Sequence, residues 1–587
     1  MSAISLGERI ADLLVAEGTD RFFSLPEVTF GKLHDALDRR GVPLIAPHHE
    51  AVAGYMAEAY AQMTGQIGVC GGSVGPGAMN LYTAMAHSRE ENLPVLYLGS
   101  ERTLRARNSP RRSKFQVPPN LDVARQLTKY AAIVEEPLEV DAIFQEAFRQ
   151  LRTGTPGPVY IGLPFDLLLE SVEFGPLVPP EHYRPATFVD TVCDADIERA
   201  IAMLRAARRP LLLGGSGIRL ARAQRAFAAL AEACGCPVML TVGGRGVLPD
   251  THPQLFDLGV GPGLEIAREA DVIFAIGAAI GEKIGYGGNP YFPGQQGFPN
   301  YFGAPGVQKW IHLERDPLVI GRNRPIDLAL LGDLRFALPR LTVALAREST
   351  LPGAGVVAAL QAERGRYYRE LGESLVRDGT PIHPAHAVLE VQKTLPSDVV
   401  MVRDGGAISI WQKELLCHPI SENLMAMKQG MLGTGMPYAM GAALAVRDDG
   451  RRVCLITGDG SFGFYAMELE TAVRYGLPIV IVVAYDGGWA LEVPYYLHVV
   501  GRTFEVDHGF IRLDEWAKTM GAHGEFCDSP EQIVPAMQRA FACGRPALVQ
   551  LMVDRQAAAF EMPNTHLWTR WHADRSVYEN SPNHEVL

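Results

Sequence analysis

Long hydrophobic runs are absent from this sequence of 587 residues. No stretch reaches about 18 apolar residues without a charge, the length that a membrane-spanning helix requires, so we expect no membrane partner. The first residues mix acids and bases in an amphipathic pattern and lack the apolar core of a signal peptide. Because 47% of the residues are hydrophobic, the composition indicates a globular, soluble protein, and we expect it in the cytoplasm.

The sequence also lacks a long basic run and a cysteine framework. Its net charge of −12 argues against a nucleic-acid partner. Of the eight cysteines only Cys234 and Cys236 lie close together, and a lone Cys-Gly-Cys is a poor zinc motif. We therefore expect buried free thiols in a reducing compartment.

What recurs instead is a short apolar run followed by a segment with helical periodicity. Such alternation is typical of doubly wound parallel α/β sheets with helices on both faces. We predict strands in ten of these runs, at 67–72, 94–99, 158–163, 210–215, 237–242, 271–277, 309–314, 398–405, 452–460 and 478–487.

Two polar, proline-bearing stretches, 173–185 and 346–355, divide the chain. We therefore predict three consecutive α/β domains followed by a C-terminal tail, 556–587. The tail is either disordered or docked, and its tryptophans and tyrosine favour a docked active-site lid. The predicted domains cover residues 1–175, 186–345 and 356–555.

An aspartate follows each of the last two strand-like runs. Asp459 lies in Gly-Asp-Gly-Ser directly after one run, and Asp486 follows the next. Ligands bind at the carboxyl ends of parallel strands, so these carboxylates should lie side by side. Two carboxylates beside a glycine-rich, phosphate-binding turn predict a Mg²⁺ site. The simpler interpretation is a pair of helix N-caps.

The two motifs together resemble the thiamine-diphosphate-binding signature of the acetolactate synthase and pyruvate decarboxylase superfamily. That signature usually reads Gly-Asp-Gly followed by Asn-Asn, whereas here Asn-Asn is replaced by Tyr485-Asp486. The resemblance implies two roles in one place, binding a metal ion and binding the cofactor's diphosphate. The metal ligands would be Asp459, Asp486 and the carbonyl of Gly488, and the diphosphate would be bound by Gly458, Gly460 and Ser461.

The N-terminal block resembles the family's pyrimidine-binding domain. Its segment PHHEAVAGYMAEAYAQMTG resembles the one whose glutamate binds the cofactor's aminopyrimidine ring, which implies that role for Glu50. A helix N-terminal acid is the alternative. The loop GSVGPGAMN resembles a family loop that would place Gly75 beside the cofactor. Gln116, after Ser-Lys-Phe, is a candidate active-site donor.

The other blocks carry further landmarks of the family. KQGMLGTGMPYAMGAALA resembles the loop that bends the cofactor, with Leu432 beneath its two rings and the carbonyl of Gly430 accepting the 4′-amino group. The middle block resembles a central domain that binds FAD in some members and ADP or coenzyme A in others. Because family members pair Glu50 with the diphosphate site across subunits, the resemblance implies a homodimer or homotetramer.

Glu492 is the candidate acid/base for the substrate. It stands six residues past Asp486, an offset at which pyruvate-decarboxylase-like members carry a glutamate that faces the reacting centre. The alternative is a surface glutamate. The basic loop 105–114 includes Arg111 and Arg112, which either form a solvated face or bind the phosphates of an anionic substrate.

The basic loop and the possible lid favour one reaction among those of the family. This is a lyase reaction that cleaves a 2-hydroxyacyl-coenzyme A to formyl-coenzyme A and an aldehyde or ketone. The alternative is a carboligase or decarboxylase of 2-oxo acids of the acetolactate synthase type. A non-catalytic cofactor-binding subunit is remote, because Glu50, Asp459 and Asp486 are all present.

Overall fold

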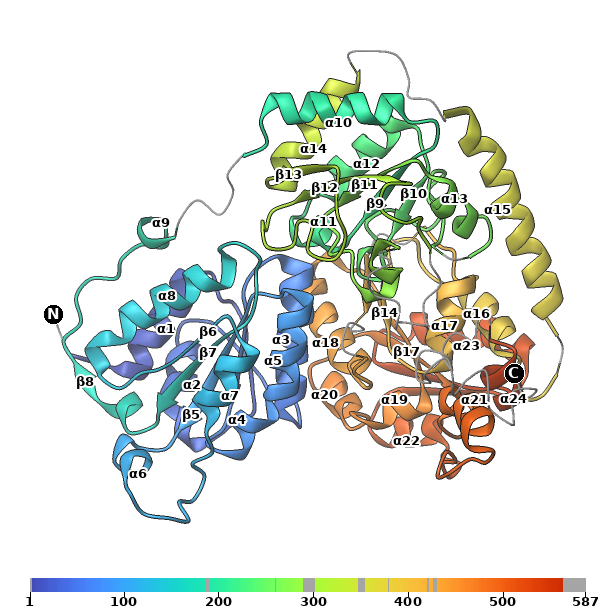
Figure 1. The fold of residues 1–587 in the computed structure, drawn as a ribbon. Helices are drawn as coiled ribbons and strands as arrows, with labels where there is room; N and C mark the ends of the chain where they lie inside the picture. Colours follow the sequence, from blue (N-terminus) through green and yellow to red (C-terminus); the bar gives the residue numbers. More distant parts are fainter. Residues whose placement is uncertain are drawn as a thin grey trace. The chain divides into compact units, whose positions relative to one another are not determined.

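The computed structural model describes residues 3–184, 191–258, 260–288, 301–346, 354–377, 379–419, 422–425 and 430–562. Within these ranges, three parallel sheets carry the fold, and a short antiparallel pair joins β1 (Ile4–Ser5) to β8 (Ser171–Val172). The predicted fold class of three α/β sheets is therefore confirmed (Figure 1). Each of the ten predicted runs overlaps a strand of these sheets.

The N-terminal sheet has six strands. Its order is β3 (Leu44–Ile45), β2 (Phe22–Ser24), β4 (Gly68–Gly72), β5 (Val95–Glu101), β7 (Val159–Pro164) and β6 (Tyr130–Ile133). A capping box starts the first helix, because Ser5 accepts from the Glu8 N–H at 3.2 Å and Glu8 accepts from the Ser5 N–H at 2.9 Å. The helices of this part are α1 (Leu6–Ala16), α2 (Gly31–Asp38), α3 (Glu50–Thr64), α4 (Pro76–Asn80), α5 (Tyr82–Glu91), α6 (Leu104–Asn108), α7 (Asn120–Leu127), α8 (Val140–Arg152) and α9 (Pro180–Tyr183).

The middle sheet has five strands. They are β10 (Val238–Leu240), β9 (Pro210–Gly214), β11 (Val272–Ile276), β12 (Lys309–Glu314) and β13 (Leu328–Leu331). Apolar side chains of α10, α12 and α14 pack on one face, and those of α13 pack on the other. The helices here are α10 (Asp194–Ala206), α11 (Ser216–Leu220), α12 (Gln224–Cys234), α13 (Gly263–Glu269), α14 (Leu334–Ala346) and α15 (Ala354–Leu375).

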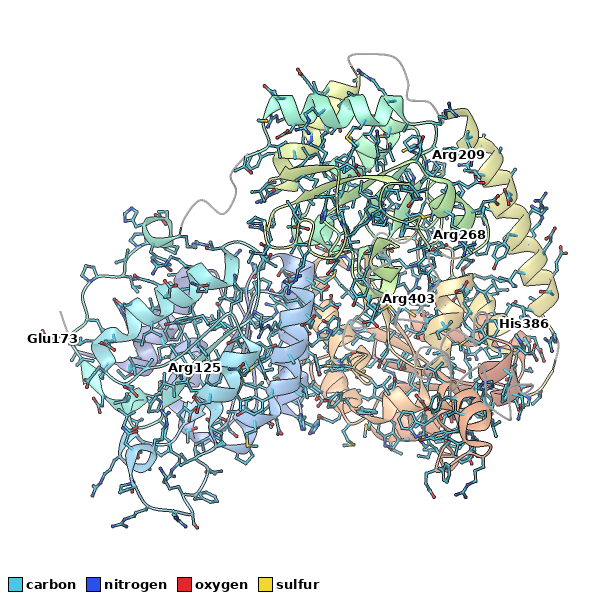
Figure 2. The ribbon with its side chains drawn as sticks, viewed as in Figure 1. Arg125, Glu173, Arg209, Arg268, His386 and Arg403 are labelled. Atoms are coloured by element: carbon cyan, nitrogen blue, oxygen red, sulfur yellow. The ribbon has the colours of Figure 1, made fainter. Side chains whose placement is uncertain are left out.

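The C-terminal sheet has six strands. They are β15 (Glu422–Met425), β14 (Val400–Arg403), β16 (Val453–Gly458), β17 (Ile479–Tyr485), β19 (Ala547–Met552) and β18 (His523–Cys527). Figure 2 labels Arg403, the residue that ends β14. The helices are α16 (Pro384–Gln392), α17 (Ala407–Leu415), α18 (Gly435–Ala445), α19 (Asp459–Gly463), α20 (Glu468–Arg474), α21 (Val493–Tyr495), α22 (Leu513–Thr519), α23 (Ile533–Ala542) and α24 (Arg555–Phe560).

The chain divides into two compact units that do not follow the order of the sheets. Unit 1 comprises Met1–Thr187, Lys428–Gly450 and Tyr465–Ile479, and unit 2 comprises the rest. Helices α18 and α20 follow strands of the C-terminal sheet along the chain, but they fall in the same compact unit as the N-terminal sheet. At the packing of α18 on α3, a Cβ added to Gly441 would lie 2.4 Å from the Met56 carbonyl oxygen, so only glycine permits this approach.

Several expectations about the whole chain can be compared with the structure. All eight cysteines are free thiols, and five of them are buried, whereas Cys193 is exposed. Among the described residues, no helix combines the length and the apolar character needed to cross a membrane. Of the predicted tail, only residues 556–562 are described, and the predicted lid otherwise lies outside the described residues.

Candidate functional site

The two aspartates lie just past the ends of neighbouring strands. β16 ends at Gly458 and Asp459 begins α19, while Asp486 directly follows β17. β16 and β17 are hydrogen-bonded neighbours in the sheet, as expected from the sequence. The Gly487 N–H donates to Asp459 Oδ2 at 3.1 Å, so the segment after β17 contacts the first carboxylate directly.

Both carboxylates lie in surroundings that disfavour their charge. Burial raises the pKa of Asp459, and His508 Nδ1, 3.9 Å from Asp459 Oδ2, opposes this rise. Burial and the charge of Asp459 raise the pKa of Asp486 to about 8, and Arg555 opposes that rise. A divalent cation between the two carboxylates would relieve their repulsion, so this oxygen-rich pair fits Mg²⁺.

Ser461 adds a donor that suits a phosphate. Its Oγ is buried and has no hydrogen-bond partner within the part of the chain that the structure describes. A buried hydroxyl without a partner is costly, and a ligand oxygen would satisfy it. Gly460 lies against the Trp489 ring, where an added Cβ would come within 2.8 Å of that ring. The site thus fits a diphosphate bound through Mg²⁺.

A short antiparallel pairing holds the segment after Asp486. The Gly488 N–H donates to Asp486 Oδ1 at 3.1 Å. The Trp489 N–H donates to the Val506 carbonyl at 2.8 Å, and Arg555 donates to the same carbonyl at 2.7 Å. The contributions of His508 and Arg555 were missed from the sequence, because both residues approach the aspartates only through tertiary folding.

Glu492 ends the short 3₁₀ helix η7 (Ala490–Glu492). Its side chain is exposed, and its carboxylate makes no hydrogen bond to another described residue. A π-helical turn, η8 (Tyr496–Val500), follows after α21, and such turns are frequent at functional sites. The position leaves the carboxylate accessible to a substrate, and it is equally compatible with a surface glutamate.

Glu50 begins α3 in unit 1 and is only 7% exposed. Its carboxylate accepts from Asn80 Nδ2 at 2.9 Å and from Ser73 Oγ at 3.5 Å. A Cβ added at Gly77 would lie 2.5 Å from Glu50 Oε1 and 2.3 Å from Ser73 Oγ. Gly77 therefore leaves the room that this carboxylate occupies. The roles of Asn80 and Gly77 were not predicted, although both residues lie in the loop GSVGPGAMN, residues 72–80.

Two residues singled out separately in the sequence lie together. A Cβ added at Gly75 would lie 2.8 Å from Gln116 Cβ. Gln116 has a φ of 55°, a left-handed conformation that is uncommon for a residue other than glycine. Such backbone outliers cluster at ligand sites, which favours a role for this pair.

The loop that carries Gly430 and Leu432 is also part of unit 1. Gly430 is exposed with a φ of 64°, and Leu432 is half-buried. Between them, Met431 contacts α3, because the Tyr55 hydroxyl lies 3.0 Å from its sulfur. The predicted ring-binding residues Glu50 and Leu432 are thus carried by one compact unit.

The basic loop gives no further sign of its role. Arg111 and Arg112 are exposed, and neither forms an ion pair with an acid in the described ranges. Both the solvated face and the anion-binding interpretation stay open. No cluster of three or more His, Cys, Asp or Glu side chains suited to a metal occurs among the described residues. The magnesium prediction therefore rests on two carboxylates and a backbone carbonyl.

Three family models match the chain. Their descriptions are "Thiamine pyrophosphate enzyme, N-terminal TPP binding domain" for residues 4–123, "central domain" of the same enzyme for residues 197–341, and "C-terminal TPP binding domain" for residues 404–551. Thiamine pyrophosphate is another name for thiamine diphosphate. Together the matched residues include strands of all three sheets.

Curated relatives match along nearly the whole chain. The "Probable acetolactate synthase" of Mycobacterium bovis is 28% identical over 94% of this chain and 96% of its own length. The "Acetolactate synthase" of Bacillus subtilis is 28% identical over 93% of both chains. The "Acetolactate synthase large subunit" of Parasynechococcus marenigrum is 29% identical over 82% of this chain and 76% of its own.

Proposed function

The chain belongs to the thiamine pyrophosphate enzyme family, and from that premise we propose that it is a decarboxylase or carboligase of 2-oxo acids. The observation that carries this proposal is the match along most of the chain to proteins named acetolactate synthase. The reaction would remove carbon dioxide from a 2-oxo acid. The remaining acyl fragment would join a second carbonyl compound or leave as an aldehyde.

The residues present suit the binding of the cofactor. When bound, thiamine diphosphate supplies a nucleophilic carbon and accepts the electrons of the breaking carbon–carbon bond. Asp459, Asp486 and the Gly488 carbonyl would hold Mg²⁺, and Ser461 would donate to the diphosphate. The unpartnered Ser461 hydroxyl and the mutual repulsion of the aspartates support this assignment.

Two glutamates of the chain would move protons. Glu50, held by Asn80 and Ser73, would exchange a proton with the aminopyrimidine ring. Because Glu50 is almost completely buried, water would be kept away from the hydrogen bond between its carboxylate and the ring. Glu492, exposed beyond the second aspartate, would give or take a proton at the substrate. Gln116, next to Gly75, would donate a hydrogen bond there.

The 2-hydroxyacyl-coenzyme A lyase reaction, favoured in the sequence analysis, gains no support from these relatives. The names of the relatives favour the alternative, which we adopt. Binding of ADP, coenzyme A or FAD in residues 186–345 stays a prediction, as does phosphate binding by Arg111 and Arg112. A homodimer or homotetramer also stays a prediction, which light scattering of the purified protein would measure.

One assay separates the two reactions. The purified protein with thiamine diphosphate and Mg²⁺ is given pyruvate and a panel of larger 2-oxo acids, and carbon dioxide, acetolactate-type products and aldehydes are measured. We expect carbon dioxide from at least one 2-oxo acid. A parallel panel of 2-hydroxyacyl-coenzyme A esters is tested for formyl-coenzyme A. Formyl-coenzyme A without any release of carbon dioxide would overturn the proposal.

Replacing Glu492 by glutamine tests its role as the acid/base. We expect the turnover number to fall by about a hundredfold or more, because positioned acid/base groups contribute about 10²–10⁴. Glu505→Gln is the matched control, since Glu505 is also exposed and lies in the same unit. We expect it to keep the wild-type rate. An unchanged rate for Glu492→Gln would assign Glu492 to the surface.

A further inference from the structure

Arg555 adds a positive charge to the edge of the C-terminal sheet that carries both aspartates. β19 lies beside β17, and its last residue, Met552, pairs with Tyr485, the last residue of β17. The Val553 N–H donates to the Tyr485 carbonyl at 3.0 Å, one residue before Asp486. Arg555 follows as the first residue of α24. The ends of the neighbouring strands β16, β17 and β19 thus lead to the two aspartates and to Arg555.

The guanidinium of Arg555 lies against the segment that follows Asp486. Its Nη2 donates to the Val506 carbonyl at 2.7 Å, and the Trp489 N–H donates to the same carbonyl at 2.8 Å. A Cβ added at Gly488 would lie 2.7 Å from this Nη2 and 2.0 Å from the Val506 carbonyl oxygen. Glycine therefore permits a close approach here, and the arginine lies beside the residue whose carbonyl we expect to bind Mg²⁺.

The positive charge of Arg555 acts on Asp486. It opposes the rise of the Asp486 pKa that burial and Asp459 cause. Nη1 of Arg555 also donates to Asp507, but that side chain is 78% exposed, so water screens the pair. His508 is a basic neighbour of the other aspartate, with its Nδ1 3.9 Å from Asp459 Oδ2. A guanidinium, unlike an imidazole, stays protonated across the physiological pH range, so Arg555 supplies a constant charge.

The site carries more negative charge than the family signature predicts. That signature has an amide where this chain has Asp486, so one negative charge is added at the metal. Mg²⁺ would offset the two aspartates, but the diphosphate brings negative charge of its own, and the hydroxyl of Ser461 is neutral. We propose that Arg555 offsets the additional charge of Asp486 and thereby strengthens the binding of thiamine diphosphate. The proposal rests on the proposed magnesium and diphosphate site, and Arg555 lies outside the matched residues 404–551.

Arg555→Gln tests the proposal, with Arg539→Gln as the matched control. Arg539 lies in the same compact unit, and its Nε and Nη2 each donate to Glu525 at 2.8 Å. Each variant therefore loses one arginine–carboxylate pair, but the Arg539 pair includes neither aspartate of the site. We expect the Kd for thiamine diphosphate at saturating Mg²⁺ to rise about tenfold for Arg555→Gln, the size of effect that one charge has on another near a protein surface. Arg539→Gln should keep the wild-type Kd.

Two further variants separate the charge of Arg555 from its hydrogen bonds. Arg555→Lys keeps the charge and loses the planar fork, and we expect its Kd to stay close to that of the wild type. The double variant Arg555→Gln, Asp486→Asn has the same net charge at the site as the wild type. We expect it to bind thiamine diphosphate more tightly than Arg555→Gln alone.

The Kd is measured by calorimetry, and the melting temperature of each cofactor-free variant is recorded beside it. A wild-type Kd for Arg555→Gln would overturn the proposal. Either a double variant no tighter than Arg555→Gln or an Arg555→Lys variant as weak as Arg555→Gln would also overturn it, because the arginine would then act through its hydrogen bond to Val506. Because the readout is cofactor binding, the absence of 2-oxo acid turnover would refute the proposed function without affecting this result.

Discussion

Glutamine in place of Glu50 is expected to lower the turnover number by about 10²–10⁴. The substitution keeps the size of the side chain and its position at the start of α3, but it removes the carboxylate that would exchange a proton with the aminopyrimidine ring. An amide oxygen can still accept from Asn80 Nδ2, which donates to Glu50 at 2.9 Å. Steady-state kinetics at saturating thiamine diphosphate would measure the loss.

A matched variant separates this chemical effect from a loss of folding. Glu17 is also a buried glutamate of unit 1, but it pairs with Arg184 at 3.3 Å. We expect Glu17→Gln to keep the wild-type turnover number. If Glu50→Gln turns over as fast as the wild type, Glu50 is only a helix N-terminal acid.

The second large effect is expected at Asp486, and it depends on what replaces it. Asp486→Ala removes a metal ligand, so the Mg²⁺-dependent affinity for thiamine diphosphate should fall at least about a hundredfold, because even groups that merely orient ligands are worth about 10–100-fold. Asp486→Asn keeps a ligand oxygen and relieves the repulsion from Asp459, which contributes to the raised pKa of Asp486. We expect that variant to bind within about tenfold of the wild type, since amide oxygens also ligate such cations.

Calorimetric titration of thiamine diphosphate into each variant, with Mg²⁺ and with a chelator, would measure both effects. We expect Asp459→Ala to resemble Asp486→Ala, and we expect the chelator to abolish binding by the wild type. If Asp486→Ala and Asp486→Asn both bind thiamine diphosphate as tightly as the wild type, Asp486 is not a ligand of the metal. If the wild type binds thiamine diphosphate equally well with the chelator present, no metal ion takes part in cofactor binding.

The strand ends that position the aspartates were readable from the sequence for local reasons. β16 and β17 are continuous apolar runs, each closed by a glycine or an aspartate, so strand and turn are encoded within a few residues. The helix after β16 was placed differently. Its first turn, α19, begins at Asp459 itself and α20 begins only at Glu468, whereas the helical pattern in the sequence indicated one helix over 464–476.

The contacts of Glu50 and Glu58 could not be read in the same way. Asn80 reaches Glu50 only because α4 follows a turn that brings it back to the start of α3. Tyr438 reaches Glu58 across most of the chain, and no local periodicity reports such a pair. Short strands such as β13, Leu328–Leu331, were also missed, because their few residues carry little pattern of their own.

The interleaving of the two units has a consequence for biosynthesis. Every residue of α3 from Glu50 to Ala61 is buried, and α18 packs against this helix. A ribosome that has finished the N-terminal sheet has not yet made α18 or α20, which end at Ala445 and Arg474. Domains generally fold as units in the order of their synthesis. Here the first unit is complete only once residue 479 has been translated, so the side of α3 that packs on α18 lacks this partner while the middle sheet is made.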